Sequence, residues 1–550
     1  MSPKEPSYTR ADAALRRISR RSALGGLLST SALAAAVPGE PPVQRSARVD
    51  AAAHGVVADG STDDAPALLR AVAALTDDSV LTLPGGVIAL GSPGWPGIAL
   101  RRLRNVRIQG SGTILKWLAV PRQALGPFGP TGLLLQECQG AHVSDLELDG
   151  NGISCIGLGL ETCESCTISL VEAYAHGGRP GGLGQLASCR GVGNRWLGCV
   201  ARDSTPGSQF RGFYLGNANR GWGETDLRIE GCSARNNDAT GFAIGAVRLT
   251  CSASTSLGNA GAGFISATAP GSPSVDHVFI GNLAQRNRFH GWQTDVYGPP
   301  AERIVLSGNN FSYNAFCGAL CHQGSGVSIS DNVLAYNGEP TGAGAIEISR
   351  SNDVIVSSNL VQGDATHGIC IKTAFPANTL QRIIIANNRF TGSGSNTIWL
   401  DALDGATTLQ GLRFSGNIIN GGRCGLSLAA AAGARLEELT IADNIVDGAA
   451  DASYRFSAAA AGQLAALRLT GNAGARPQFG PNGTPGTELN NAWNPAQGRG
   501  LAPPHQGEWR RGAILYNAEP AVGAPLGWIC TADGTPGAWS SFGLIGGSPT

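Results

Sequence analysis

The sequence predicts an all-β protein whose main domain is a parallel β-solenoid. The first observation is a repeated Asn that follows a short apolar run and recurs every 23 to 29 residues, at Asn282, Asn309, Asn332, Asn359, Asn388, Asn417, Asn444 and Asn472. The second is that each Asn is preceded by a strand-like run such as "VIVS" and followed, after a Gly, by another such as "GICIKT". Short strands joined by Gly and Asn turns at this period indicate one coil per repeat. The Asn is expected at the turn between strands, as a structural ladder.

Composition agrees with a turn-rich β protein and excludes some partners. The 550 residues include 79 Gly, carry no net charge and contain only 15% charged residues. Without a basic patch there is no electrostatic basis for binding nucleic acid. The 13 Cys lack the paired short spacings of a zinc site, "CESC" at 163–166 being isolated, so buried thiols are expected. No metal or cofactor is predicted, and the sequence leaves the role of calcium undecided.

Residues 1–40 are predicted to be an export signal. A basic region leads into a weakly apolar segment, Ala23–Val37, which is too short to span a bilayer. "SRRSAL" resembles the twin-arginine signal through Arg20 and Arg21, and a Sec signal is the alternative. With cleavage near Ala36, the mature protein is expected to be periplasmic or secreted, without a membrane span.

A segment after the signal indicates a helix that caps the solenoid. "HGVVADGSTDDAPALLRAVAAL" at 54–75 resembles the N-terminal motif of the pectate-lyase-like superfamily in its Asp, Gly, Ala and Leu positions. This resemblance implies a single-stranded right-handed parallel β-helix, here assigned to residues 48–475. Asp63 and Asp64 could be taken for an acid/base pair, but the resemblance places them in the cap.

Aligning the strands that follow each Gly gives columns of outward side chains, because successive residues of a strand face opposite sides. The middle outward column reads Tyr214, Ala243, Ile265, Gln293, Leu320, Glu347, Cys370, Trp399, Ser427. The next outward column reads Gly216, Gly245, Ala267, Asp295, His322, Ser349, Lys372, Asp401, Ala429. Small residues at both ends bracket five coils with polar, charged or aromatic side chains, so this stretch is the candidate site.

The candidate catalytic residues are Asp295, His322, Glu347, Lys372 and Asp401. The candidate substrate-binding residues are Gln293, Trp399, Trp292, Tyr297 and Tyr214. These residue types suit an exported protein that cleaves a polysaccharide. Hydrolysis is ranked first, with Glu347 or Asp295 as acid and a second carboxylate as base or nucleophile. In the alternative, a lyase, Lys372 or His322 takes the proton beside a uronate carboxylate. The same side chains could instead form ion pairs on a solvated surface.

The resemblance does not extend to a particular reaction. "THGICIKT" is similar to two elements of polygalacturonases, but the Asn-Thr-Asp and Asp-Asp elements of those enzymes are absent. There is also no Asp-Pro-His run like that of mannuronan epimerases. A shared architecture does not determine the chemistry of the site.

The C-terminal part is predicted to be separate. Residues 476–508 are rich in Gly, Pro and Asn and predict a linker, and residues 509–546 predict a small β module. Its aromatic residues suit either a small core or a glycan-contacting face: Trp509, Tyr516, Trp528 and Trp539. Two non-enzymatic alternatives remain open: a glycan-binding or structural envelope β-helix, and a phage-derived trimeric spike. The partner is expected to be a polysaccharide, and the protein a monomer or a homotrimer.

Overall fold

The computed structural model describes residues 47–546 except 92–93, 123–128, 154, 178–183, 217–222, 269–273, 296–297, 339–343, 365, 373–378, 403–406, 481, 483–485, 495–498, 506–508 and 510. The predicted export signal at 1–40, with its proposed cleavage site, lies outside the described residues. Among the residues described, no helix combines the length and the apolar character needed to cross a membrane.

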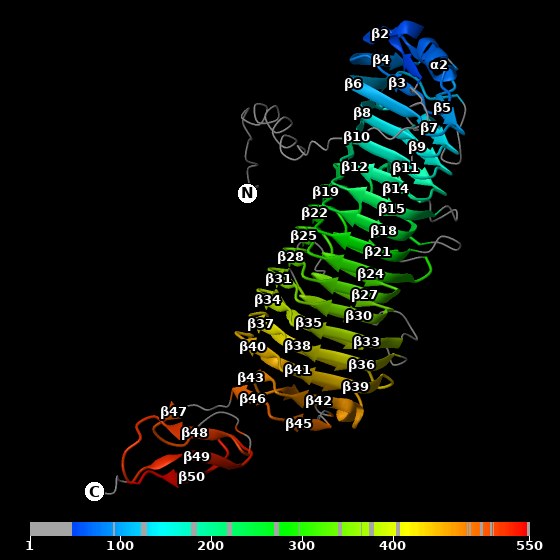
Figure 1. Ribbon diagram of the computed structural model, residues 1–550. Coiled ribbons are helices and arrows are strands. Elements are labelled where there is room, and N and C mark those ends of the chain that lie inside the picture. Colours follow the sequence, from blue (N-terminus) through cyan, green and yellow to red (C-terminus); the bar gives the residue numbers. More distant parts are fainter. Residues whose placement is uncertain are drawn as a thin grey trace, which may run out of the picture. The chain divides into compact units, whose positions relative to one another are not determined.

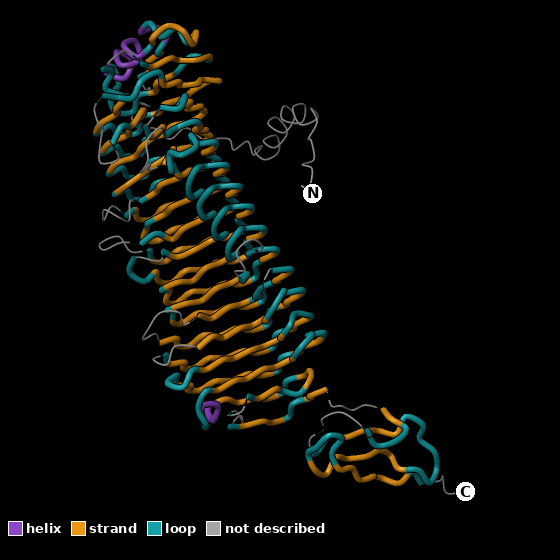
Figure 2. The backbone as a smooth tube through the Cα atoms, turned by 180° about the vertical axis from the view of Figure 1, so that it is seen from behind, coloured by secondary structure: helices purple, strands orange, loops and turns teal. Residues whose placement is uncertain are grey.

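From β1 at Arg48 to β46 at Asn494 the chain winds into parallel coils, which confirms the predicted β-helix (Figure 1). One wall is a 15-stranded sheet in which each strand pairs with its equivalent in the next coil. The other walls belong to a 31-stranded sheet, whose strands follow one another in two columns around the coil (Figure 2). Every strand pair within these two sheets is parallel, so one register carries each side-chain column through the stack.

The strands of the 15-stranded sheet are β5 (Ile98–Arg101), β7 (Thr131–Gln136), β9 (Ile156–Glu161), β11 (Gly184–Cys189), β14 (Arg211–Leu215), β17 (Phe242–Ile244), β20 (Phe264–Ser266), β23 (Trp292–Thr294), β26 (Ala319–His322), β29 (Ile346–Ser349), β32 (Ile369–Lys372), β35 (Asn396–Ala402), β38 (Cys424–Ala430), β41 (Ala452–Ala458) and β44 (Gln478–Phe479).

The first column of the 31-stranded sheet contains β6 (Arg107–Trp117), β8 (His142–Asp149), β10 (Thr167–Tyr174), β12 (Arg195–Leu197), β15 (Glu224–Glu230), β18 (Ala246–Ser252), β21 (Val275–Ile280), β24 (Ala301–Ser307), β27 (Gly324–Ser330), β30 (Asn352–Ser357), β33 (Thr379–Ala386), β36 (Thr408–Ser415), β39 (Arg435–Ala442), β42 (Leu467–Thr470) and β45 (Thr487–Leu489). The second column contains β13 (Val200–Arg202), β16 (Ser233–Arg235), β19 (Thr255–Leu257), β22 (Leu283–Gln285), β25 (Asn310–Ser312), β28 (Val333–Ala335), β31 (Leu360–Gln362), β34 (Arg389–Thr391), β37 (Ile418–Asn420), β40 (Ile445–Asp447), β43 (Ala473–Ala475) and β46 (Ala492–Asn494).

The N-terminal end of the stack carries the predicted helix, α2 (Ala65–Ala73), beside η1 (Ala52–His54), β1 (Arg48–Asp50), β2 (Asp59–Asp63), β3 (Val80–Thr82) and β4 (Gly86–Leu90) (Figure 1). Asp64 is buried, and its two carboxylate oxygens accept the backbone N–H groups of Val57 and Ala58 at 2.8 and 3.0 Å. Asp63 Oδ1 accepts the N–H of Ala65 at 3.1 Å. Both carboxylates therefore fix backbone in the cap, because backbone donors without a partner are costly when buried.

The interior is built from apolar columns. Phe213, Phe242 and Phe264 stack face to face, with ring centroids 4.5 and 4.8 Å apart. This separation matches the strand spacing of about 4.8 Å, so identical side chains in register stack without a gap. All 13 Cys are buried, as expected from the sequence.

The repeated Asn forms a continuous buried ladder, and it continues past Asn472 to Asn491. At each step the Oδ1 atom of one Asn accepts both the backbone N–H and the Nδ2–H of the Asn one coil earlier; for Asn332 and Asn359 both distances are 3.0 Å. The Nδ2 group also donates to a backbone carbonyl, as from Asn359 to Ile329 O at 2.8 Å. The ladder thus satisfies polar backbone groups at a turn that water does not reach.

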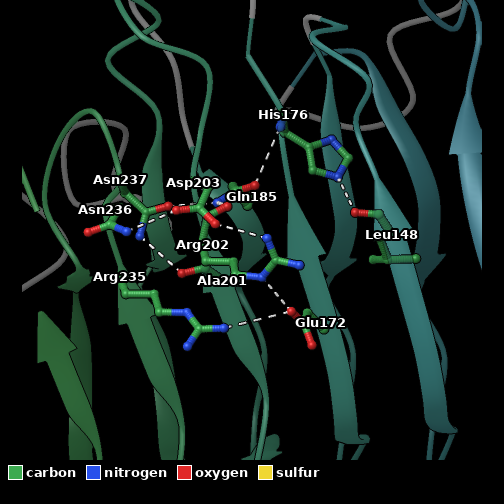
Figure 3. Close-up of polar contacts among 10 residues, drawn as sticks. All are labelled: Leu148, Glu172, His176, Gln185, Ala201, Arg202, Asp203, Arg235, Asn236 and Asn237. Carbon is green, nitrogen blue, oxygen red and sulfur yellow. Dashed lines mark hydrogen bonds and ion pairs between the residues drawn. The ribbon is translucent and has the colours of Figure 1, made fainter. Parts of the chain in front are cut away.

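A second ladder, which the sequence analysis missed, runs through Asn237, Asn259, Asn287, Asn314 and Asn337 and ends at Asp364. Figure 3 shows its beginning, where Gln185 Nε2 donates to Asn237 Oδ1 at 2.6 Å and Asn237 Nδ2 donates to Ala201 O at 3.0 Å. A signal for this ladder was present in the sequence, because Asn287, Asn314 and Asn337 each follow an Asn of the first ladder by five positions.

The parallel pairing continues beyond residue 475, since β44, β45 and β46 lie within the stretch expected as a linker. A short 3-10 helix, η3 (Gln463–Ala466), precedes β42. Farther on, β47 (Arg499–Gly500), β48 (Ile514–Asn517), β49 (Pro525–Ala532) and β50 (Ala538–Leu544) form a separate four-stranded sheet. Trp509, which precedes β48, meets Trp539 on β50 edge to face with ring centroids 5.1 Å apart.

Candidate functional site

Strand register brings the two predicted outward columns together on the 15-stranded sheet. Glu347 on β29 pairs with Cys370 on β32, and Cys370 pairs with Trp399 on β35. In the next column Lys372 pairs with Ser349 on one side and with Asp401 on the other. The strand register in these coils therefore agrees with the two predicted columns.

The centre of the candidate site is an ion pair between Glu347 and Lys372. Lys372 Nζ lies 2.7 Å from Glu347 Oε2, and their side chains are 34% and 17% exposed respectively. The same carboxylate oxygen faces the thiol of Cys317 at 3.8 Å. Burial lowers the pKa of Lys372, but the hydrogen bond and charge of Glu347 outweigh this effect and leave its pKa above the ordinary value. Lys372 is thus a cation rather than a base at neutral pH.

His367, two residues before β32, lies near enough to this pair for both charges to act on its pKa. Its Nδ1 atom is 3.0 Å from the carbonyl oxygen of Asn396, so Nδ1 carries the proton of the neutral ring and Nε2 is left as the acceptor. Its ring packs on Trp399 with centroids 4.4 Å apart. Burial and then Lys372 lower the pKa of His367, although the Asn396 carbonyl and Glu347 oppose them. At neutral pH the ring is therefore an uncharged base.

His290, three coils earlier in the same column, has the opposite tautomer. Its Nδ1 atom accepts the backbone N–H of Cys317 at 3.2 Å, so Nε2 carries the proton in the neutral ring. Phe316 packs on the ring with centroids 5.4 Å apart. Burial, helped by the charge of Lys372, lowers the pKa of His290 to about 4. His290 is therefore a neutral hydrogen-bond donor.

Three residues predicted for the site are not accessible to a substrate. Trp292 is fully buried because its position on β23 faces the core, where it packs against Phe279. Tyr214 faces outward but is only 6% exposed, and the guanidinium group of Arg211 covers its ring at 4.9 Å. His322 is 4% exposed, and its Nδ1 atom lies 2.8 Å from Ser349 Oγ. The predictions that Trp292 and Tyr214 stack on sugars and that His322 is an accessible base are therefore wrong.

The four remaining predicted residues are Gln293, Asp295, Trp399 and Asp401, together with Tyr297 outside the described residues. Gln293 and Asp295 are partly exposed on and next to β23, two coils before Glu347. Trp399 is partly exposed. Asp401 is described only through its backbone on β35, and Tyr297 lies outside the described residues.

Sequence reasoning missed three members of this site: His290, Cys317 and His367. A signal was present, because "HGWQTDV" at 290–296 and "HGICIKT" at 367–373 share His-Gly before an inward apolar residue. The Gly forms the corner of the coil: a Cβ on Gly291 would lie 2.6 Å from Gly318 O and one on Gly368 2.8 Å from Thr397 O. The residue before such a corner lies at the edge of the outer face of the sheet. This position could not be predicted from the sequence.

A second polar cluster lies on the 31-stranded sheet but is structural (Figure 3). Glu172 binds Arg202 and lies 4.0 Å from Arg235, and Arg202 also binds Asp203 at 2.8 Å. Nearby His176 is fully buried, and burial lowers its pKa to about 4. Its ring nitrogens face the carbonyl oxygens of Leu148 and Cys155. The charged side chains of this cluster therefore pair with one another, and the His176 ring contacts backbone carbonyl groups.

Within the described ranges, no group of three or more His, Cys, Asp and Glu is arranged to hold a metal ion.

Comparison with known proteins identifies the fold. No protein-family model matches the chain, and no curated protein matches it by sequence. Among solved structures, the A-module of a mannuronan C-5 epimerase from Azotobacter vinelandii is similar over 62% of this chain and 96% of its own, with 17% identity and a TM-score of 0.51. Tailspike protein 3 of bacteriophage CBA120 is similar over 90% of this chain and 68% of its own, with 12% identity and a TM-score of 0.51. At this level of identity the likeness establishes a shared parallel β-helix and leaves the function to the site.

Proposed function

We propose that this protein binds a polysaccharide along the outer face of the 15-stranded sheet and cleaves it beside Glu347 and Lys372. The observation that carries the proposal is the partly buried Glu347–Lys372 ion pair with neutral His367 and partly exposed Trp399 beside it. An ion pair made only for stability has no need of an uncharged base next to it, whereas proton-transfer chemistry does. A polysaccharide ligand agrees with the similar epimerase module, whose name gives mannuronan as its substrate.

Between the two cleavage chemistries, the described contacts favour elimination. A lyase needs a base next to the sugar and a cation that neutralises the charge developing on a uronate carboxylate. His367 and Lys372 fill these roles in their ordinary charge states at neutral pH. This assignment moves the base from Lys372, named in the sequence prediction, to His367.

Hydrolysis remains the second candidate because of strand register. Lys372 contacts Glu347, and its backbone is in register with that of Asp401 on the following coil. The Glu347 and Asp401 coils are two apart, or about 10 Å along the stack, which falls at the upper limit of the spacing used by inverting glycosidases. Glu347, however, is paired with an ammonium group, a state suited to a base rather than to the protonated acid of that mechanism.

Incubation with acidic and neutral polysaccharides tests the proposal. Reducing ends and the ultraviolet absorbance of unsaturated uronates are measured together, for the wild type and for Lys372→Ala and Glu347→Ala. Lys116→Ala and Glu302→Ala are matched controls on the 31-stranded sheet. Elimination gives both signals, and Lys372→Ala lowers them by about 100-fold or more while the controls do not. Reducing ends without the absorbance indicate hydrolysis. A folded wild type that cleaves none of the polysaccharides contradicts the proposal and supports a binding or structural role.

A further inference from the structure

The two histidines of the site are held in complementary tautomers by the backbone. The carbonyl group of Asn396 fixes the proton of His367 on Nδ1, and the N–H group of Cys317 fixes that of His290 on Nε2. The atoms left for a ligand are therefore an acceptor on His367 and a donor on His290. His290 and His367 thus occupy equivalent positions of one column but present opposite hydrogen-bonding groups. A surface residue that is merely repeated from coil to coil would not require this difference.

We propose that His367 Nε2 is the proton shuttle of an elimination on a uronate-containing polysaccharide, and that His290 Nε2–H binds an oxygen of the same substrate. This inference rests on the proposed function and adds the substrate class and the residue that moves the proton. Among the described residues, Lys372 donates one hydrogen bond, to Glu347, and an ammonium group has three N–H donors, so two further donors can serve a substrate carboxylate.

The step balances without a further reactant. The C5–H bond breaks and its proton moves to Nε2 of His367, while the electron pair forms the C4–C5 double bond. The C4–O4 bond breaks with its electrons on O4, and Nε2 of His367 returns the proton to that oxygen. His367 is neutral before and after the reaction. His290 serves as a donor rather than an acid because a neutral imidazole holds its single ring proton tightly, a role that neutral histidines fill in other enzymes.

The charges around His367 support this assignment. The charges of Lys372 on β32 and Glu347 on β29 act on its pKa, and Trp399 packs on one side of its ring. Near Lys372, further titratable groups among the described residues are the thiols of Cys317 and Cys370 and the ring of His290. The lowered pKa of His367 keeps it a base at neutral pH and below. As the pH is lowered, activity is therefore expected to fall only below about pH 6.5, the ordinary pKa of histidine.

The first test needs no substrate. Nitrogen-15 NMR of histidine-labelled protein at pH 7.5 distinguishes the two tautomers, and the spectra of His290→Gln and His367→Gln assign the signals. We expect an Nε2–H tautomer for His290 and an Nδ1–H tautomer for His367. The opposite tautomer at either residue, or a charged ring at either, overturns the inference even if the protein cleaves a polysaccharide.

The second test measures kinetics on a polyuronate that the wild type cleaves. His367→Gln is expected to lower kcat by about 100- to 10,000-fold, with little change in KM, and to abolish the acid limb of the pH profile. His290→Ala is expected to raise KM by about 10- to 100-fold, and His290→Gln, which places an N–H near Nε2, to restore part of it. His142→Gln, on β8 of the other sheet, is the control.

The outcomes separate the two proposals. If Lys372→Ala is inactive but His367→Gln keeps its rate and its acid limb, the proposed function stands and the shuttle is refuted. If only neutral glycans are cleaved, the uronate assignment is refuted. If the wild type cleaves nothing, the proposed function fails and the reaction role of His367 fails with it, whatever its tautomer.

Discussion

Replacing Glu224 by Gln should make the protein more stable at alkaline pH. Glu224 begins β15 and is 1% exposed. Its carboxylate accepts hydrogen bonds from Asn194 Nδ2 and from the backbone N–H of Gly191, both at 3.2 Å, and the Ser188 side chain also acts to lower its pKa. Burial raises the pKa of Glu224 from 4.5 to about 7, against the opposing effect of these hydrogen bonds. Near neutral pH the folded protein therefore holds a proton that the unfolded chain has released.

The direction and size of the effect follow from linkage. Because the folded-state pKa is raised, the stabilising contribution of the protonated carboxyl is complete below pH 4.5 and is lost as the pH rises to about 7. The difference of about 2.5 pKa units, at about 1.4 kcal/mol for each, gives a loss of about 3 kcal/mol between pH 4.5 and pH 8. Gln cannot ionise, so this loss should be absent from Glu224→Gln.

Urea-induced unfolding, followed by tryptophan fluorescence at pH 4.5 and pH 8, measures the effect. Subtracting the pH response of Glu224→Gln from that of the wild type removes the contributions of all other groups. The control is Glu230→Gln at the exposed end of the same strand, which should respond to pH as the wild type does. If Glu224→Gln loses stability between the two pH values in parallel with the wild type, the buried carboxyl is ionised throughout and the reasoning is refuted.

Three further substitutions test the coil architecture and the site. Asn359→Ala removes the acceptor of two buried donors on the preceding Asn, so the free energy of unfolding, measured by urea titration, should fall by about 2–5 kcal/mol. The control Asn420→Ala, at an exposed position, should lower it by less than about 0.5 kcal/mol. Equal effects would contradict a stabilising ladder. Phe242→Ala opens a gap in the aromatic column and should cost about 3–5 kcal/mol by the same measurement; a cost below about 1 would mean that the coils close over the gap. Trp399→Ala should weaken polysaccharide binding, measured by calorimetry with Lys372→Ala as background, by about 3- to 10-fold; unchanged affinity would exclude this ring as a sugar contact.

The β-helix architecture could be predicted from the sequence because many weak signals repeat at the period of one coil. The Asn at each turn and the apolar pair of each inner strand recur often enough to set the register, and that register placed Glu347 and Lys372 on adjacent coils. The alternation of strand residues is a geometric property, so columns could be read before contacts were known.

The site itself could be predicted only in part, for two physical reasons. Alternation of side chains predicts which side of the strand a residue faces but not whether its neighbours cover it. Tyr214 and His322 therefore face outward as predicted and are nevertheless buried. Alternation also fails at the Gly corners, where the chain bends between sheets. His290 and His367 precede these corners, and their positions and tautomers depend on backbone groups of the next coil.

The two Asn ladders have a polarity that a list of their hydrogen bonds does not convey. Each amide accepts with its oxygen from the preceding coil and donates with its nitrogen to the following one, so the amide dipoles are aligned head to tail, as peptide dipoles are in a helix. Such a series can be extended by inserting a coil that carries Asn, and it is terminated by a side chain that accepts but has no amide hydrogens to pass on. Asp364 is such a side chain, at the end of the second ladder. A single change from amide to carboxyl thus marks where one ladder stops, while the other continues to Asn491.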